Sequence, residues 1–386
     1  MNKSFFQGLL IVLFLISIEA QAEVPKIYNL QFSDNPATLG KWLTLSFEFE
    51  GKLDKLYLEN TWDTPTGETK KEVKEYSIKP AMKEKPQGLI HFRWKSENLN
   101  AKPSHVIRIW VRDSAGNQSN VLSGEVQILK PILEEEVKIP IQIKTVFGTK
   151  TLNLSATIYR PDQDGRFPLL VLNHGSPINE QGRRSMETFR NQSMIFVRKG
   201  FIVAVPMRRG YGSSEGDYAE DGGKCDNYDY DRVAKEAVKD IEATVAFMKQ
   251  GVYVDGRKKI VMVGQSSGGF SSLAYGASHP DDVAAIINFA GGKVRPQQNK
   301  FCSEDRLKET MSNFGKTSRM PTLWIYVEQD PYAPPELYKK IFEIYRDKGG
   351  LGKFLLFSSD YGHSFFYKGV KAWQPMVEEF LKAVGS

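Results

Sequence analysis

The residues best suited to do chemistry form the run Gly264-Gln-Ser-Ser-Gly268, a G-x-S-x-G pattern. The run follows the apolar stretch 259–263 and precedes a helix expected over residues 270–278. A tight turn from a strand into a helix strains the backbone of its central serine and presents the hydroxyl above the sheet. The flanking glycines leave room where the strand and the helix cross closely. The pattern therefore predicts Ser266 as a nucleophile.

A serine hydroxyl attacks only when a base removes its proton and an anion orients that base. Two histidines, His279 and His363, lie downstream of Ser266. His279 comes at the end of the expected helix, directly before Pro280, and is interpreted as a helix C-terminal residue. His363 lies in the loop after the last apolar strand, where the base of such an arrangement belongs. We predict His363 as the general base.

The acid that orients the base is expected at the end of the preceding strand, where Glu328 and Asp330 are the candidates. Asp330 lies beyond the expected end of the strand and directly before Pro331, whose ring stiffens the turn. Asp330 is therefore favoured, and Glu328 is the alternative. Asp360 is closer to His363 in sequence but is expected to point away along the same loop.

Acyl transfer also needs hydrogen-bond donors for the negative charge that develops on the carbonyl oxygen. The backbone N–H of Ser267, directly after the nucleophile, is one expected donor. The segment Asn173-His-Gly-Ser-Pro177 follows the apolar strand 168–172 and should supply the other. Pro177 has no N–H, so the N–H of Ser176 is predicted as the second oxyanion donor, and His174 is interpreted as a residue that braces this loop.

The elements that must position these residues lie in the second half of the chain. Continuous apolar runs alternate there with helical stretches, which indicates strands buried on both faces of a mostly parallel sheet. The first two strands, about 137–146 and 152–159, alternate instead and predict an antiparallel edge hairpin. We expect a three-layer α/β domain over residues 131–386. The buried strands are expected at 168–172, 201–205, 259–263, 284–289, 322–327 and 354–357.

The first half of the chain follows a different pattern, with short alternating segments separated by turn residues and no helical period. About seven strands are expected over residues 23–130, which is typical of an antiparallel β-sandwich. The turn at Ala115-Gly-Asn117 resembles the final hairpin of bacterial immunoglobulin-like or fibronectin type III-like modules.

Residues 1–22 are predicted to be a signal peptide for export to the periplasm or beyond. Lys3 supplies the positive charge, residues 9–18 form an apolar stretch too short to span a bilayer, and Ala20-Gln-Ala22 offers the small residues of a cleavage site. An uncleaved membrane anchor is the alternative. In an oxidising compartment the two cysteines, Cys225 and Cys302, are expected to form a disulfide.

The composition narrows the function classes. The 386 residues are 41% hydrophobic and 25% charged, as in ordinary globular proteins. The 52 basic and 46 acidic residues are mixed along the chain, so the net charge of +6 predicts no nucleic-acid partner. Two cysteines and the histidine spacing exclude the common zinc and iron–sulfur sites. No cofactor and no stable membrane insertion after signal cleavage are expected, and the oligomeric state is left open.

The segment 212–231 carries seven acidic residues and three tyrosines, with a fourth tyrosine, Tyr211, directly before it, and it follows a strand that should end beside the nucleophile. Tyr211, Tyr218 and Tyr228 are candidates for the rim of the substrate site. A solvated loop whose last acids favour the start of the following helix is the competing interpretation. A calcium site in this segment also stays open, although no EF-hand spacing is present.

Several of these motifs together resemble the α/β-hydrolase superfamily over roughly residues 135–386. They are His174-Gly175, the stretch Arg208-Arg-Gly-Tyr-Gly-Ser-Ser-Glu-Gly216, the turn 264–268, Asp330 and His363. The resemblance is narrower to the branch of dienelactone hydrolases and prolyl oligopeptidases, and it implies a serine hydrolase. Dienelactone hydrolases have a cysteine where this chain has Ser266, and prolyl oligopeptidases carry a β-propeller. The resemblance therefore implies neither family's substrate class for this chain.

We expect an exported serine hydrolase that cleaves a carboxylic ester of a small molecule through an acyl-enzyme on Ser266. The first alternative is a serine exopeptidase acting on short peptides, whose amine-binding acids the segment 215–231 would supply. The second is an inactive binding or adhesion protein, against which the complete set of Ser266, Asp330 and His363 argues.

Overall fold

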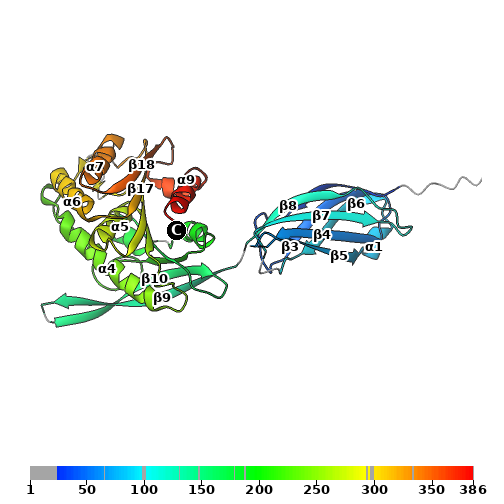
Figure 1. Cartoon of the computed structure of the whole chain (residues 1–386), viewed down its shortest axis with the longest axis horizontal. Helices are drawn as coiled ribbons and strands as arrows, with labels where there is room; N and C mark the ends of the chain where they lie inside the picture. Colours follow the sequence, from blue (N-terminus) through cyan, green and yellow to red (C-terminus); the bar gives the residue numbers. More distant parts are fainter. Residues whose placement is uncertain are drawn as a thin grey trace, which may run out of the picture. The chain divides into compact units, whose positions relative to one another are not determined.

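The computed structural model describes residues 24–385 apart from 65, 98–100, 130, 147, 178, 187, 293, 296–299 and 333. The expected signal peptide lies outside the described residues. The chain divides into two compact units between residues 129 and 130 (Figure 1). Within the described part of the chain, no helix combines the length and the apolar character needed to cross a bilayer.

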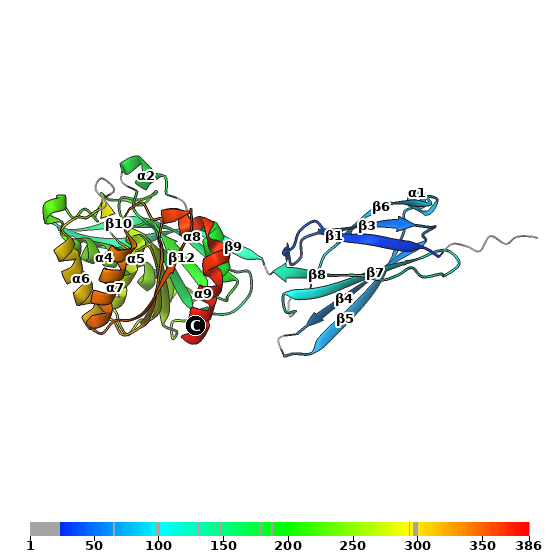
Figure 2. The same cartoon turned by 90° about the horizontal axis from the view of Figure 1, so that it is seen from above.

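The N-terminal unit is an all-β sandwich of a three-stranded sheet, β1-β3-β6, and a five-stranded sheet, β2-β8-β7-β4-β5, which Figure 2 shows facing each other. The neighbouring strands are antiparallel except for β2 and β8, which pair in parallel. The elements are β1 (Lys26–Phe32), β2 (Ala37–Thr38), β3 (Leu43–Glu50), β4 (Lys55–Asp63), β5 (Thr69–Ser77), α1 (Pro80–Lys83), β6 (Gln87–Trp94), β7 (Ser104–Arg112) and β8 (Leu122–Leu129).

Period-two alternation explains why these segments form a sandwich. In β3 every second side chain, from Leu43 to Phe49, is buried between the sheets, while Glu48 and Glu50 face solvent. One polar pair is buried in the same unit, because Nδ1 of His105 lies 2.9 Å from Oδ1 of Asn60.

The C-terminal unit contains an eight-stranded sheet in the order β18-β17-β14-β13-β11-β12-β10-β9. Only β10 runs against its neighbours in this sheet, so the expected mostly parallel sheet is confirmed. The strands are β9 (Ile132–Thr145), β10 (Gly148–Pro161), β11 (Leu169–Asn173), β12 (Ile202–Pro206), β13 (Ile260–Gln265), β14 (Val283–Phe289), β17 (Pro321–Val327) and β18 (Leu351–Phe357), and the short strands β15 (Val294–Arg295) and β16 (Lys300–Phe301) pair separately.

Helices cover both faces of the sheet, which makes the unit three layers (Figures 1 and 2). One face packs against α4, α5, α6 and α7, and the other packs against α3, α8 and α9. Every residue of β11, β12 and β13 is buried, as expected for strands covered on both faces. The helices are α2 (Glu180–Arg184), α3 (Arg190–Val197), α4 (Tyr230–Gln250), α5 (Ser267–Ser278), α6 (Glu304–Thr317), α7 (Pro335–Asp347), α8 (Phe365–Lys368) and α9 (Val370–Ala383), with single 3-10 turns at η1 (Cys225–Asn227) and η2 (Gly362–Ser364).

The hairpin of β9 and β10 is longer than the sequence pattern indicated. Its fourteen paired positions run from Thr145 and Gly148 at the turn to Ile132 and Pro161 at the base. The end near the turn extends beyond the helices of its own unit (Figure 1) and is mostly exposed.

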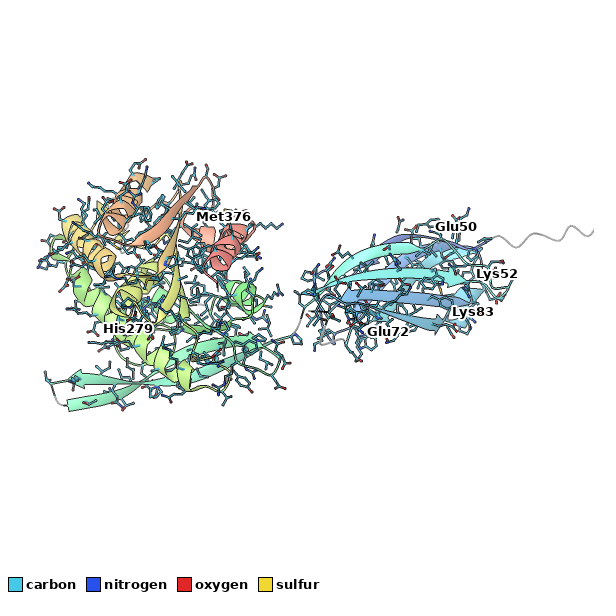
Figure 3. All side chains as sticks on the ribbon, viewed as in Figure 1. Glu50, Lys52, Glu72, Lys83, His279 and Met376 are labelled. Carbon is cyan, nitrogen blue, oxygen red and sulfur yellow. A yellow bond between two sulfur atoms is a disulfide. The ribbon has the colours of Figure 1, made fainter. Side chains whose placement is uncertain are left out.

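The expected disulfide is present and joins Cys225, in η1, to Cys302, directly before α6. The Oγ of Ser303 reinforces this junction, because it donates to the carbonyl oxygen of Cys225 and accepts from the N–H of Tyr228. His279 ends α5 as expected, at the position labelled in Figure 3, and its Nε2 lies 3.0 Å from Oε1 of Glu242.

Candidate active site

Ser266 occupies the turn between β13 and α5 with a backbone φ of 56° and ψ of −124°. A non-glycine residue rarely adopts a positive φ, so surrounding contacts must hold it there. The N–H of Ser266 donates to the carbonyl oxygen of Phe289 at 2.8 Å, and its own carbonyl oxygen accepts from the N–H of Gly269 at 2.9 Å. The residue is therefore anchored on both sides in the strained conformation that exposes its hydroxyl.

The two glycines of the motif allow backbone segments to approach closely. A Cβ on Gly264 would lie 2.2 Å from the carbonyl oxygen of Gly268, and one on Gly268 would lie 2.1 Å from that of Asn173. Both distances are too short for any side chain. The glycine spacing in the sequence thus reflects the crossing of β13, α5 and the loop after β11.

His363 and Asp330 meet across two loops at the same edge of the sheet. Nδ1 of His363 donates to Oδ2 of Asp330 at 2.8 Å, and the other oxygen of Asp330 accepts from the N–H of Tyr332 at 2.9 Å. The Asp330 side chain is 1% exposed, whereas Glu328 is exposed. With Nδ1 occupied, Nε2 is the ring nitrogen left to exchange a proton with a serine or a leaving group.

A single glycine keeps these two loops in contact. Gly362 has a φ of 49°, and a Cβ at this position would lie 2.9 Å from the carbonyl oxygen of Gln329. Any other residue would push the His363 loop away from the Asp330 loop.

The loop after β11 is braced from behind by His174, which is fully buried. Its Nδ1 donates to the carbonyl oxygen of Gly175 at 2.7 Å, and its Nε2 accepts from the N–H of Arg208 at 3.1 Å. Both ring nitrogens are engaged in holding the loop, as expected for a bracing residue. Gly175 packs against Ser266, since a Cβ on Gly175 would lie 3.1 Å from Cβ of Ser266.

The two predicted oxyanion donors both lie beside Ser266. Ser176 lines the same pocket as Ser266. Ser267 is the first residue of α5, where the N–H has no acceptor within the helix. Two N–H groups are thus placed at the N-terminal end of α5 and on the adjacent loop, where the helix dipole also favours negative charge.

Behind this loop, two arginines form buried ion pairs. Arg208 is fully buried and pairs with Glu220, while Nε of Arg209 contacts Oδ1 of Asp240 at 2.6 Å. Burial alone would lower the pKa of Arg208, but Glu220, Tyr211 and Asp240 together outweigh it and the net shift is upward. Burial raises the pKa of Asp240 to about 6 against the opposing effect of Arg209.

A pocket of about 460 Å³ opens above Ser266 and His363. Its described lining includes no Asp, Glu, Lys or Arg side chain. Three tyrosines contribute to the wall, and the loop after β11 contributes small residues. The lining residues are Gly175, Ser176, Pro177, Asn179, Gly182, Met186, Gln265, Ser266, Ala290, Gly292, Tyr332, Tyr338, His363, Ser364 and Tyr367.

Sequence reasoning missed the tyrosines of this wall. Tyr332 is two residues after Asp330, and Tyr367 is four residues after His363. Their closeness in sequence to the predicted acid and base was the available signal. Tyr338 carried no such signal, because it reaches the pocket from α7.

The expected rim tyrosines lie elsewhere. Tyr228 belongs to the hydrophobic core under α4, so its expected place on the rim is wrong. Tyr211 is fully buried, and its hydroxyl contacts Oγ of Ser176 at 2.7 Å, which makes it a support of the loop after β11. Tyr218 packs edge-on against Tyr211 and under the guanidinium of Arg183. None of the three is among the described lining residues.

Three acids of segment 212–231 make contacts that hold the fold together. Glu220 is buried against Arg208, Asp229 accepts from the N–H of Arg232 at the start of α4, and Oδ1 of Asp231 accepts from the hydroxyl of Thr310. These contacts favour the interpretation of a structural loop that leads into a helix. Among the described residues no cluster of three or more acidic, histidine or cysteine side chains is arranged to hold a metal ion.

A second hollow, of about 860 Å³, lies between α4, α5 and α6. It contains none of the predicted site residues, and its lining is a mixture of acids, lysines and small residues.

The model of the X-Pro dipeptidyl-peptidase (S15) family matches residues 150–336. Solved structures similar to this chain include an esterase from Pyrococcus furiosus, with 16% identity over 64% of this chain and 90% of that one, at a TM-score of 0.45. A putative dienelactone hydrolase from Klebsiella pneumoniae has 15% identity over 64% and 98%, at a TM-score of 0.46. Acetyl xylan esterase 1 from Thermoanaerobacterium has 17% identity over 67% and 89%, also at 0.46.

Proposed function

We propose that this chain, a serine hydrolase of the α/β-hydrolase superfamily, cleaves carboxylic esters through an acyl-enzyme formed on Ser266. The observation that carries the proposal is that His363, joined to the buried Asp330 at 2.8 Å, lines the same pocket as Ser266. A nucleophile, a base and an orienting acid in one pocket are what acyl transfer requires.

The reaction proceeds in two halves. Nε2 of His363 takes the proton of the Ser266 hydroxyl as Oγ attacks the ester carbonyl, and the N–H groups of Ser176 and Ser267 stabilise the oxyanion. The intermediate collapses, the C–O bond to the alcohol breaks, and His363 gives its proton to the leaving oxygen. Water then enters, loses a proton to His363 and attacks the acyl carbonyl, which releases the acid and restores Ser266.

The lining of the pocket supports an ester over a peptide. A peptidase that removes residues from a free N-terminus needs an anionic group for the substrate ammonium, and the described lining supplies none. Glu220, an acid of the segment expected to provide it, is already paired with Arg208. The match to the X-Pro dipeptidyl-peptidase family model keeps short peptides as the second candidate substrate.

The nucleophile is tested by labelling with a fluorophosphonate probe. Wild-type protein should be labelled, and Ser266→Ala should not. Ser278→Ala, at the other end of α5, is the matched control and should label like wild type, because Oγ of Ser278 contacts the carbonyl oxygens of Ala274 and Tyr275 within its own helix. Equal labelling of wild type and Ser266→Ala would exclude Ser266 as the nucleophile.

The substrate class is tested with p-nitrophenyl esters against aminoacyl and X-Pro p-nitroanilides. We expect turnover of the esters to exceed that of the anilides in kcat/KM. Turnover of the anilides alone would make the chain a peptidase.

We also propose that the protein works outside the cytoplasm. The Cys225–Cys302 disulfide and the signal expected in residues 1–22 support export. Fractionation of the producing cells, with a cytoplasmic and a periplasmic marker, tests this location.

A further inference from the structure

The chemistry of the proposed reaction determines which part of the pocket receives the alcohol. The carbonyl oxygen must face the N–H groups of Ser176 and Ser267, while the leaving oxygen must receive its proton from His363. The alcohol therefore occupies the side of the pocket next to the imidazole of His363. Any side chain that packs against that imidazole and also lines the pocket contacts the leaving group.

Tyr332 meets both conditions. Its ring centroid lies 4.3 Å from that of His363, with 59° between the ring planes, and it lines the pocket. Its backbone is held independently of the side chain, because the N–H of Tyr332 donates to Oδ1 of Asp330 at 2.9 Å. The side chain can thus be changed without removing the hydrogen bond that supports the acid.

The character of the wall indicates what kind of alcohol fits. Tyr338 and Tyr367 lie on the wall with Tyr332, and the hydroxyl of Tyr367 contacts Oε1 of Gln265 at 3.3 Å. Aromatic faces with neighbouring polar groups, and no Asp, Glu, Lys or Arg among the described lining residues, suit a neutral ring, which stacks by its flat face. A short open-chain alcohol would leave this aromatic surface uncovered.

We propose that Tyr332 forms the leaving-group subsite and selects esters whose alcohol is a ring, either a phenol or a sugar. The inference rests on the proposed esterase function and names the substrate class of that site. Because the alcohol has left before water attacks, Tyr332 acts on acylation and has no partner in deacylation.

The experiment compares cyclohexyl acetate with isopropyl acetate. Both are esters of secondary alcohols, but only cyclohexanol contains a ring. Tyr332→Ala should lower kcat/KM about five-fold for the cyclohexyl ester, in line with the strength of a ring-stacking contact, and less than two-fold for the isopropyl ester. Tyr332→Phe, which keeps the ring, should retain the wild-type preference. Phenyl acetate and an acetylated methyl xyloside then distinguish a phenol from a sugar. The ester whose kcat/KM falls more in Tyr332→Ala carries the kind of alcohol that the subsite prefers.

The exposed Tyr361 is the matched control, since it lies two residues before His363 but is not among the lining residues. Tyr361→Ala should leave the ratio of the two esters unchanged. With p-nitrophenyl acetate, the burst rate of Tyr332→Ala should fall while the steady-state deacylation rate stays at the wild-type value. Tyr332→Leu serves as a second variant if the alanine variant does not fold.

An equal loss for the two acetates, or a slower deacylation, would overturn the leaving-group subsite while leaving the esterase function intact. Absence of Ser266-dependent ester turnover by the wild type would instead overturn the proposed function, and this inference with it.

Discussion

At the residue scale, two carboxylates that are neighbours in sequence have different environments. Glu328 directly follows β17 and is exposed, whereas Asp330 is buried and bonded to His363. The chain turns inward at Asp330 because its carboxylate accepts from the N–H of Tyr332, and Gly362 lets the His363 loop approach. Sequence position favoured Asp330 over Glu328, and the hydrogen bond supports that choice.

Asp330→Asn should lower kcat for ester hydrolysis by about 10³–10⁴-fold, because an amide can fix the wrong tautomer of the base and cannot stabilise its cationic form. Glu328→Gln makes the matched change two residues away and should alter kcat less than two-fold. Steady-state kinetics at pH 7.5 checks both. A larger loss in Glu328→Gln than in Asp330→Asn would reverse the assignment of the acid.

At the element scale, the turn that carries Ser266 lies within a covalently closed part of the chain. The disulfide joins Cys225 to Cys302 across 77 residues, and this span includes α4, β13, α5 and β14. In the chain-entropy model, closing a loop of this length stabilises the folded state by about 4.5 kcal/mol, because it restricts the unfolded chain.

Replacing both cysteines, in Cys225→Ser with Cys302→Ser, should therefore lower the free energy of unfolding of the C-terminal unit by up to about 4 kcal/mol. Urea unfolding of the full chain measures the loss. Reduction of the wild-type protein should lower its free energy of unfolding by a similar amount. Unreduced wild type should contain no thiol that iodoacetamide can alkylate. Two alkylatable thiols in unreduced, exported protein would contradict the disulfide.

At the scale of the whole molecule, each unit has a hydrophobic core of its own, so their stabilities can respond differently to pH. His105, in the sandwich, is 1% exposed and stacks with Trp62. Burial lowers the pKa of His105 from 6.5 to about 4. Between these two pH values the unfolded chain binds a proton that the folded unit does not, so the stability of the folded unit decreases as the pH falls.

Acidification from pH 7 to pH 4.5 should thus lower the urea midpoint of the N-terminal unit, followed by tryptophan fluorescence of the full chain. His105→Gln cannot titrate and should show a smaller decrease over the same range. An identical decrease in wild type and His105→Gln would show that other groups cause the acid sensitivity.

The sequence predicted most strands of both units because burial on one or two faces leaves a local pattern. It also predicted Ser266, Asp330 and His363, since each follows a recognisable strand. The path of segment 212–231 left no such pattern, which is why Tyr228 was misplaced and the burial of Glu220 was not foreseen. Long-range contacts, such as that of Tyr211 with Ser176, depend on how loops pack and become evident only in three dimensions.

The disulfide also has a consequence for proteolysis. A cut anywhere between Cys225 and Cys302 breaks the backbone without releasing a fragment, because both pieces stay joined through sulfur. After a cut between Ser266 and Cys302, the piece that bears Ser266 remains attached to the piece that bears His363 and Asp330. Nicked enzyme would thus run as one band on a non-reducing gel and as two after reduction.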